Sequence, residues 1–152
     1  MRFSKEVIFN QPLRRVAELL GDPDHIRHWQ ADLVSITRDS GTPGSAGAKS
    51  TLSYNSKGRA FELHETLVAA ELPAQTVSSY EAPGMVHTIT NQLAEVDEHS
   101  TKLISDNEIT FTGPMRAMGP LLGATLRRQS EQRLEHLKAY VDTGRDVTDQ
   151  ID

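Results

Sequence analysis

Polar side chains interrupt the apolar rows of several predicted strands, and these are the residues that could carry chemistry. Alternate residues of a strand point to the same face, so the more apolar alternation is taken as the face that points inward. The interrupting residues are Glu65, Asn91, Ser105 and Asn107, and His87 shares its alternation with Asn91. An unpaired buried polar group costs about 1–3 kcal/mol, so these groups are expected to bind one another or the polar end of a ligand.

Glu65 and His87 are the candidates for acid–base chemistry. Burial raises the pKa of a carboxyl, so Glu65 beside His87 could exchange protons with a bound molecule. The alternatives are a self-satisfied network that fixes the sheet, a set at the solvent end of the strands, or a Glu65 that is exposed or paired with an arginine. A bulge in this strand would bring Glu62 inward instead. No spacing here is one that proton chemistry alone requires, so the catalytic residues are unknown.

No metal or cofactor site is predicted. The chain has no cysteine, which excludes thiolate zinc sites, iron–sulfur clusters and disulfides. His25 and His28 have helical i, i+3 spacing and could supply two metal ligands, but no third ligand is evident and a solvated helix face explains them. The glycines at 41, 44 and 47 precede a strand rather than a helix, so they indicate a hairpin loop and not a phosphate cradle.

Length and composition indicate one soluble globular domain. The chain has 152 residues, of which 37% are hydrophobic and 24% charged. The formal net charge of -5 argues against nucleic acid as the main partner, because phosphate backbones bind clustered cations. No apolar run approaches the roughly 20 residues that span a bilayer, so integral membrane association is not expected. We expect a cytoplasmic location.

Periodicity predicts strands in the middle of the chain with helices on either side. A strand over 2–9 is followed by short helices over 13–20 and from Asp22-Pro23 to about Trp29. Between 32 and 111 short loops separate about six more strands, which indicates an antiparallel meander. A long amphipathic helix follows, beginning or kinked at Pro120. Residues 1–141 form the predicted domain, and 142–152 form a flexible acidic tail without a periodic face.

This order of elements resembles the START-like helix-grip superfamily, also called SRPBCC, and is closest to its polyketide cyclase/dehydrase and lipid transport-like members. The residues that carry the resemblance are Asp22-Pro23, His28-Trp29, Leu72-Pro73 and the closing helix after Phe111-Thr112-Gly113. The resemblance implies an α+β fold in which a curved seven-stranded antiparallel sheet wraps around the C-terminal helix. It also implies a deep cavity between sheet and helix that binds apolar molecules and, in some members, directs their chemistry.

The leading hypothesis is a protein that binds a small apolar or amphipathic molecule, with turnover undecided. Its predicted ligand contacts are Tyr54, Phe61, Leu63, Glu65, His87, Ile89, Asn91, Leu103, Asn107, Ile109, Met118, Leu122 and Leu126, with Leu52 also in the cavity wall. The second hypothesis is a cyclase, dehydratase or hydrolase-like enzyme that acts on a polyketide or related carbonyl compound. The third is an accessory module that docks on a protein partner through 115–123. Both a monomer and a homodimer fit the sequence.

Three further features each have more than one interpretation. Trp29, the only tryptophan, either anchors the core or stacks on a ligand. The stretch 115–123 is rich in methionine and glycine and is either plain core or a gate over the cavity. Arg127, Arg128 and Arg133 meet an acidic ligand group or a membrane surface, or are solvated and paired with Glu131 and Glu135.

Overall fold

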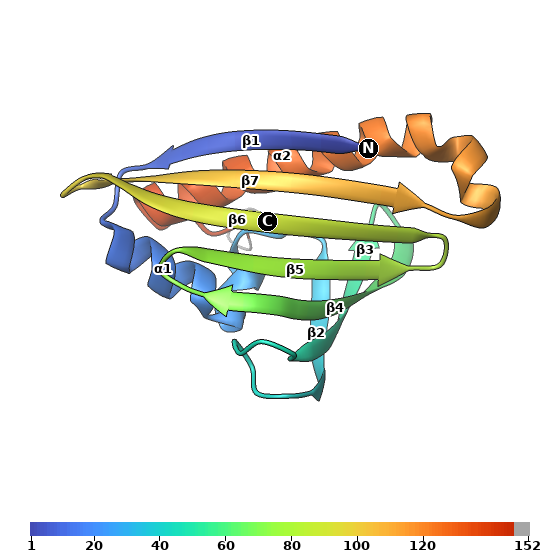
Figure 1. The fold of residues 1–152 in the computed structure, drawn as a ribbon, viewed down its shortest axis with the longest axis horizontal. Helices are drawn as coiled ribbons and strands as arrows, with labels where there is room; N and C mark the ends of the chain where they lie inside the picture. The colour runs from blue at the N-terminus through green and yellow to red at the C-terminus, as the bar shows by residue number, and fades with distance from the viewer. Residues whose placement is uncertain (148–152) are drawn as a thin grey trace.

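The fold is one antiparallel sheet with its helices on one side. The computed structural model describes residues 1–147. Within them the sheet has seven strands in the order β1-β7-β6-β5-β4-β3-β2, as predicted (Figure 1). The strands are β1 (Arg2–Phe9), β2 (Leu33–Ser40), β3 (Lys49–Ser56), β4 (Arg59–Glu71), β5 (Gln75–Ala82), β6 (Met85–Asp97) and β7 (Ser100–Phe111). From β2 to β7 each strand pairs with the next one along the chain, and β7 also pairs with β1.

Two short helices follow the first strand, and a long one closes the chain. The helices are α1 (Leu13–Gly21), the 3-10 helices η1 (Pro23–His28) and η2 (Gly113–Met118), and α2 (Gly119–Thr143). Asp22 caps η1 by accepting a hydrogen bond from the backbone N–H of Asp24 at 2.9 Å. Helix α2 passes behind β1 and β7, on the inner side of the sheet (Figure 1). This arrangement confirms the predicted helix-grip fold.

Helix α2 begins at Gly119, directly before the proline that the sequence indicated as the start of the helix or a kink in it. Pro120 lies in its first turn, where the missing N–H has no intrahelical partner to lose. The residues before it form η2, which is a separate 3-10 turn. The regular helix therefore starts here and has no proline in its interior.

The C-terminal end of the helix differs from the predicted boundary at 141. Helix α2 runs through Thr143, and Gly144 ends it with a left-handed φ of 73°. Asp142 accepts a hydrogen bond from the backbone N–H of Asn10 at 2.8 Å, and Val147 is only 4% exposed. Residues 142–147 are thus attached to the domain by contacts that an acidic composition does not reveal. Residues 148–152 of the predicted tail lie outside the described residues.

The tightest packing lies at the end of the sheet where α1 and the second half of α2 meet it. Phe9, Val16 and Leu103 have no exposed surface, and Leu137 and Val141 of α2 pack in the same cluster. Full burial of such a side chain contributes roughly 1.5–3 kcal/mol. This core fixes the helix against β1, β6 and β7 and leaves the middle of the concave face for the site described next.

A bulge bends the sheet between β4 and β5. Leu67 pairs with Ser78 and Ala69 with Val77, so Val68 is an extra residue on β4. A bulge of this kind bends its strand and increases the local twist. Beyond it, β2 and β3 turn away from the direction of β5, β6 and β7 (Figure 1). The curvature hollows the inner face of the sheet.

Candidate ligand-binding site

A cavity of about 210 Å³ lies between the concave face of the sheet and the middle of α2. Strands β3 to β7 supply one wall, α2 supplies the opposite wall from Ser130 to Leu137, and η1 with Trp29 closes one side. Its apolar lining includes Leu52, Leu63, Leu67, Ile89, Leu134 and Leu137. The space is thus bounded mainly by hydrocarbon, as small-molecule sites are.

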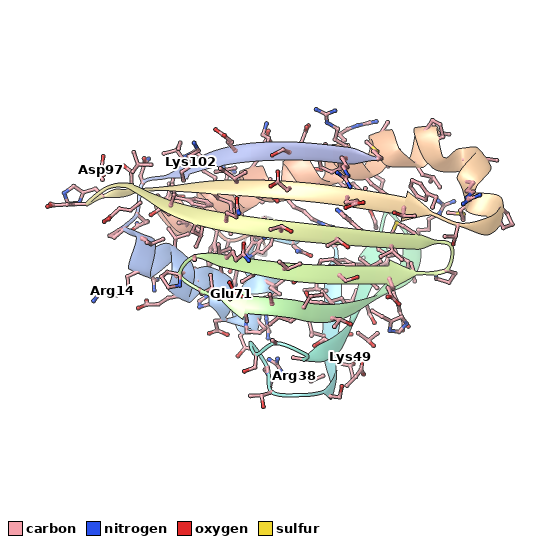
Figure 2. All side chains as sticks on the ribbon, viewed as in Figure 1. Arg14, Arg38, Lys49, Glu71, Asp97 and Lys102 are labelled. Atoms are coloured by element: carbon pink, nitrogen blue, oxygen red, sulfur yellow. The ribbon has the colours of Figure 1, made fainter. Side chains whose placement is uncertain are left out.

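The mouth of the cavity lies near the loop that connects β2 and β3. Exposed residues of its lining are Gly21 at the end of α1, Arg38 on β2, and Pro43 and Gly44 in the loop. Figure 2 labels Arg38 at this end of the molecule, beside Lys49. No residue of the 115–123 segment is among the residues that line the cavity, so the structure does not place that segment over this opening.

Strand alternation brings many of the predicted contacts into this wall. The predicted residues that line the cavity are Tyr54, Leu63, Glu65, His87, Ile89, Asn91 and Asn107, together with Leu52 and Ser105. They come from two pairs of neighbouring strands, β3 with β4 and β6 with β7, whose antiparallel register aligns their inward faces. The more apolar alternation thus identified the inner face of each of these strands.

The other predicted contacts lie elsewhere, and packing explains why. Phe61 faces inward but stacks on Tyr54, with ring centroids 5.0 Å apart. Leu103 and Ile109 are 0% and 1% exposed, so neighbouring side chains already enclose them. Met118 is 51% exposed, at the end of η2. Leu122 and Leu126 are on α2 before Ser130, which is the first residue of this helix in the cavity lining.

Glu65 and Tyr80 form a hydrogen-bonded pair across two strands. They are register partners in the β4–β5 ladder, and the Tyr80 hydroxyl donates to the Glu65 carboxylate. Burial raises the pKa of Glu65, and the hydrogen bond from Tyr80 opposes this shift. Burial also raises the pKa of Tyr80, and the neighbouring Glu65 charge adds to that effect. Within residues 1–147 Glu65 forms no ion pair with an arginine, and it is half-buried in the cavity wall rather than exposed.

His87 is held by a second polar group on β7. Its Nε2 lies 2.8 Å from Asn107 Oδ1, and Asn107 Nδ2 donates to Ser105 at 3.2 Å to the backbone oxygen and 3.4 Å to Oγ. Because the Asn107 oxygen accepts this hydrogen bond, the ring proton of His87 is assigned to Nε2, and Nδ1 carries a lone pair and no proton. Burial lowers the pKa of His87, an effect that Asn107 opposes and Arg133 reinforces. The ring is therefore neutral at neutral pH.

Asn91 has hydrogen-bonding capacity that the described residues do not use. Its register partners on either side are Thr76 and Ser105, and it lines the cavity with both. Its Oδ1 is buried without a partner within residues 1–147. Such an atom is costly in isolation, so this amide is a polar group that a bound molecule could satisfy after a small rotation.

The sequence left Arg133 to meet an acidic ligand group or a membrane surface, or to be solvated, and the structure places it in the cavity wall. Its Nη2 donates to Asp32 at 3.3 Å, and its guanidinium lies 5.0 Å from the Tyr54 ring centroid. The Tyr54 hydroxyl donates to Gln30 Oε1 at 2.8 Å, and burial raises the pKa of Tyr54 to about 12. A signal was present, because 130, 133, 134 and 137 have the spacing of one helix face. Arg127 does pair with Glu131 at 3.2 Å, in an exposed position.

The two histidines of η1 connect it to the end of α2 and do not form a metal site. His25 Nδ1 lies 2.7 Å from the Tyr140 hydroxyl, and His28 pairs with Asp146. Residues 1–147 contain no group of three or more His, Cys, Asp or Glu side chains that could hold a metal ion. Trp29, next in the chain, packs against the core cluster and also lines the cavity. The packing agrees with its role as a core anchor, and stacking of Trp29 on a ligand stays a prediction.

Comparison with sequence models of protein families shows which family this chain belongs to. The sequence model of the family described as "Polyketide cyclase / dehydrase and lipid transport" matches residues 1–142. The chain belongs to this family. The polyketide cyclase / dehydrase and lipid transport match covers the whole sheet and nearly all of α2. It confirms the START-like resemblance, while comparison with curated proteins gives no match.

Solved structures with the same fold include relatives from plants and bacteria. Ara h 8.0201 is similar over 93% of this chain and 97% of its own, with 13% identity and a TM-score of 0.75. A START superfamily protein from Mycobacterium smegmatis covers 92% and 96%, with 14% identity and a TM-score of 0.74. Major latex-like protein 151 from Panax ginseng covers 93% and 97%, with 13% identity and a TM-score of 0.67. At these identities the likeness shows the fold alone.

The helices of residues 1–147 include none that is long and apolar enough to cross a membrane.

Proposed function

We propose that this chain binds a small apolar or amphipathic molecule in the cavity between the sheet and α2. The observation that carries the proposal is a cavity of about 210 Å³ whose apolar lining is interrupted by polar groups, among them the unpartnered Asn91 oxygen. Apolar walls supply affinity and a few placed polar groups supply orientation. Membership of a family named for polyketide cyclases and lipid transport supports the same class of ligand.

The size of the cavity favours a compact ligand. Sites for drug-sized molecules have volumes of roughly 300–1000 Å³, and this cavity is smaller, at about 210 Å³. A molecule of a few linked or fused rings suits this space better than a long acyl chain does. Its hydrogen-bonding groups would meet Glu65, Asn91 or Arg133.

The test uses the neutral fluorophore N-phenyl-1-naphthylamine. Trp29 is the only tryptophan and lines the cavity, so bound dye quenches its emission by energy transfer. Leu67→Phe fills the cavity and is expected to weaken dye binding at least about tenfold, which corresponds to 1.4 kcal/mol. Val68→Phe is the matched control, because this neighbouring side chain is 54% exposed on the outer face. Absence of Trp29 quenching, or equal weakening by both substitutions, would count against binding in this cavity.

A second candidate function is proton transfer on a carbonyl compound. The observation that favours it is the convergence of Glu65, Tyr80 and His87 on one cavity, with Tyr80 between the other two across neighbouring strands. A carboxyl with a raised pKa and a neutral imidazole are the groups that general acid–base chemistry uses at neutral pH.

This candidate is tested with 2-tetralone, a two-ring ketone whose α-hydrogens exchange when it enolises. NMR in D₂O measures how far the protein accelerates that exchange. If Glu65 is the base, Glu65→Gln abolishes the acceleration and leaves N-phenyl-1-naphthylamine affinity within about twofold. No acceleration by the unmodified protein, or equal loss of binding and exchange, would leave binding as the function.

A further inference from the structure

A second hollow lies on the other side of Arg133 from the cavity. It has a volume of about 300 Å³ and is bordered by 30–32, by the turn between β3 and β4, and by one face of α2 from Thr125 to His136. Gln30 and Arg133 line both this groove and the cavity. The two spaces are therefore adjacent, and Arg133 with Gln30 stands between them.

The groove is positively charged although the chain as a whole is acidic. Lys57, Arg128 and Arg133 line it, and Asp32 is its only carboxylate among the described residues. Within residues 1–147 neither Lys57 nor Arg128 forms an ion pair, whereas the neighbouring Arg127 pairs with Glu131. The backbone of Lys57 has a φ of 53° at this turn, a value that residues other than glycine and asparagine rarely adopt. Three cations facing one carboxylate make this groove attractive to an anion.

Arg133 has unused donors at the boundary between the two spaces. A guanidinium carries five N–H donors, and within the described part of the chain Arg133 uses one of them, toward Asp32. The two side chains are 24% and 25% exposed, so the pair is shielded but reachable from the groove. A planar guanidinium in this position matches a carboxylate, sulfonate or phosphate through two parallel hydrogen bonds.

We propose that this groove binds the anionic group of an amphipathic ligand whose apolar part occupies the cavity. The proposal rests on the proposed function and narrows its ligand class to compact ring compounds that carry a carboxylate, sulfonate or phosphate. Arg133 exchanges part of its contact with Asp32 for the ligand anion, and Arg128 and Lys57 stabilise the same charge from the α2 and β3–β4 sides. Tyr54, under the guanidinium, keeps Arg133 in place through the cation–π contact.

The test compares two dyes that differ by one sulfonate. 1-Anilinonaphthalene-8-sulfonate is N-phenyl-1-naphthylamine with an added sulfonate, so the ratio of their dissociation constants reports the anion site alone. Arg128→Gln is expected to weaken the sulfonated dye about tenfold and leave the neutral dye unchanged, as the loss of one charge-assisted contact does. Arg133→Gln shifts the ratio in the same direction. Arg127→Gln, the matched control on the same helix, leaves the ratio unchanged.

The remaining arms separate this proposal from its alternatives. Inorganic phosphate that competes with the sulfonated dye but not with the neutral one supports the anion site and shows that a free anion also occupies it. An unchanged dye ratio in both Arg128→Gln and Arg133→Gln overturns the anion site while binding in the cavity stands. Equal weakening of both dyes by Arg133→Gln alone makes Arg133 a packing residue and also overturns it. Failure of both dyes to bind the unmodified protein overturns the proposed function as well.

Discussion

Glu65 and His87 are both enclosed in the cavity wall, and burial moves their pKa values in opposite directions, upward for the carboxyl and downward for the imidazole. In each case burial favours the neutral form. Burial thus disfavours a charge at these two positions, whereas Arg133 is held in the wall as an ion pair with Asp32. A ligand with an apolar part and a charged end fits this arrangement of groups.

Replacing Glu65 with glutamine should stabilise the protein in a pH-dependent way. The folded-state pKa of Glu65 lies above its ordinary value of 4.5. The folded protein therefore loses stability relative to the unfolded chain as pH rises from 4.5 through the folded-state pKa. Glutamine removes this cost and still accepts the Tyr80 hydrogen bond. Urea unfolding should show Glu65→Gln more stable than the parent at pH 7 and nearly equal to it at pH 4. A stability difference independent of pH would contradict the assignment.

His87 should make the protein less stable in mild acid. Its folded-state pKa lies below the ordinary 6.5, so the unfolded chain takes up a proton first as pH falls below 6.5. The free energy of unfolding that depends on His87 is therefore complete above pH 6.5 and declines as pH falls toward the folded-state pKa. His87→Gln keeps a donor for Asn107 but does not titrate. The parent should lose stability relative to this variant between pH 6.5 and pH 5 in chemical denaturation, and parallel pH profiles would refute the prediction.

Residue types and alternation predicted part of this site and missed the rest for physical reasons. Glu65, Asn91 and Asn107 were found because each interrupts an apolar row. Tyr80 was missed because the inward row of β5 also contains Thr76 and Ser78, so neither alternation of that strand is clearly apolar. The position of Arg133 was left open because a charged helix residue is normally solvated.

The two halves of α2 perform different tasks. Leu137 and Val141 of the second half are 2% and 4% exposed and pack in the core. In the first half Leu121 is 71% exposed, and the preceding Met118 is 51% exposed. A docking role for 115–123 stays a prediction, supported by this exposure and by a cavity that does not extend beneath the segment.

Truncations on one helix should therefore have unequal costs. Leu137→Ala leaves a cavity in the core and should lower the free energy of unfolding by about 2–5 kcal/mol. Leu121→Ala removes an exposed side chain and should change it by less than about 0.5 kcal/mol. Urea unfolding of both variants measures the difference. Similar losses would show that the first half of the helix is packed more tightly than its exposure indicates.

Elements were easier to predict than their contacts. The order of strands and helices followed from periodicity and turn residues, and Pro120 indicated either the start of the long helix or a kink in it. Leu122 with Leu126 and Leu134 with Leu137 both have the i, i+3 or i, i+4 spacing of one helix face, so spacing alone does not show which part of the helix faces the hollow. That depends on where the sheet curves, which is a property of the whole fold.

For the whole molecule, ligand binding and folding are coupled. A ligand that binds only the folded state adds about 2.7 kcal/mol to the free energy of unfolding at 100 times its dissociation constant. N-phenyl-1-naphthylamine at that ratio should raise the melting temperature of the parent and of Val68→Phe alike. For Leu67→Phe, whose affinity is expected to be at least about tenfold weaker, the same dye concentration adds about 1.4 kcal/mol or less, so its melting temperature should rise by about half as much or less. An equal rise in all three proteins would indicate binding outside the cavity.

The bulge at Val68 gives the sheet one position where chain length can change without reversing the faces of the strand. Leu67 and Ala70 both line the cavity although three positions separate them, and removal of Val68 would leave them two apart, which is the ordinary spacing of one face. Such a deletion would keep the inward residues inward but straighten β4. Homologous chains with and without this residue would then share a fold and differ in the depth of the hollow. Ligand size could thus change through a residue that never touches the ligand.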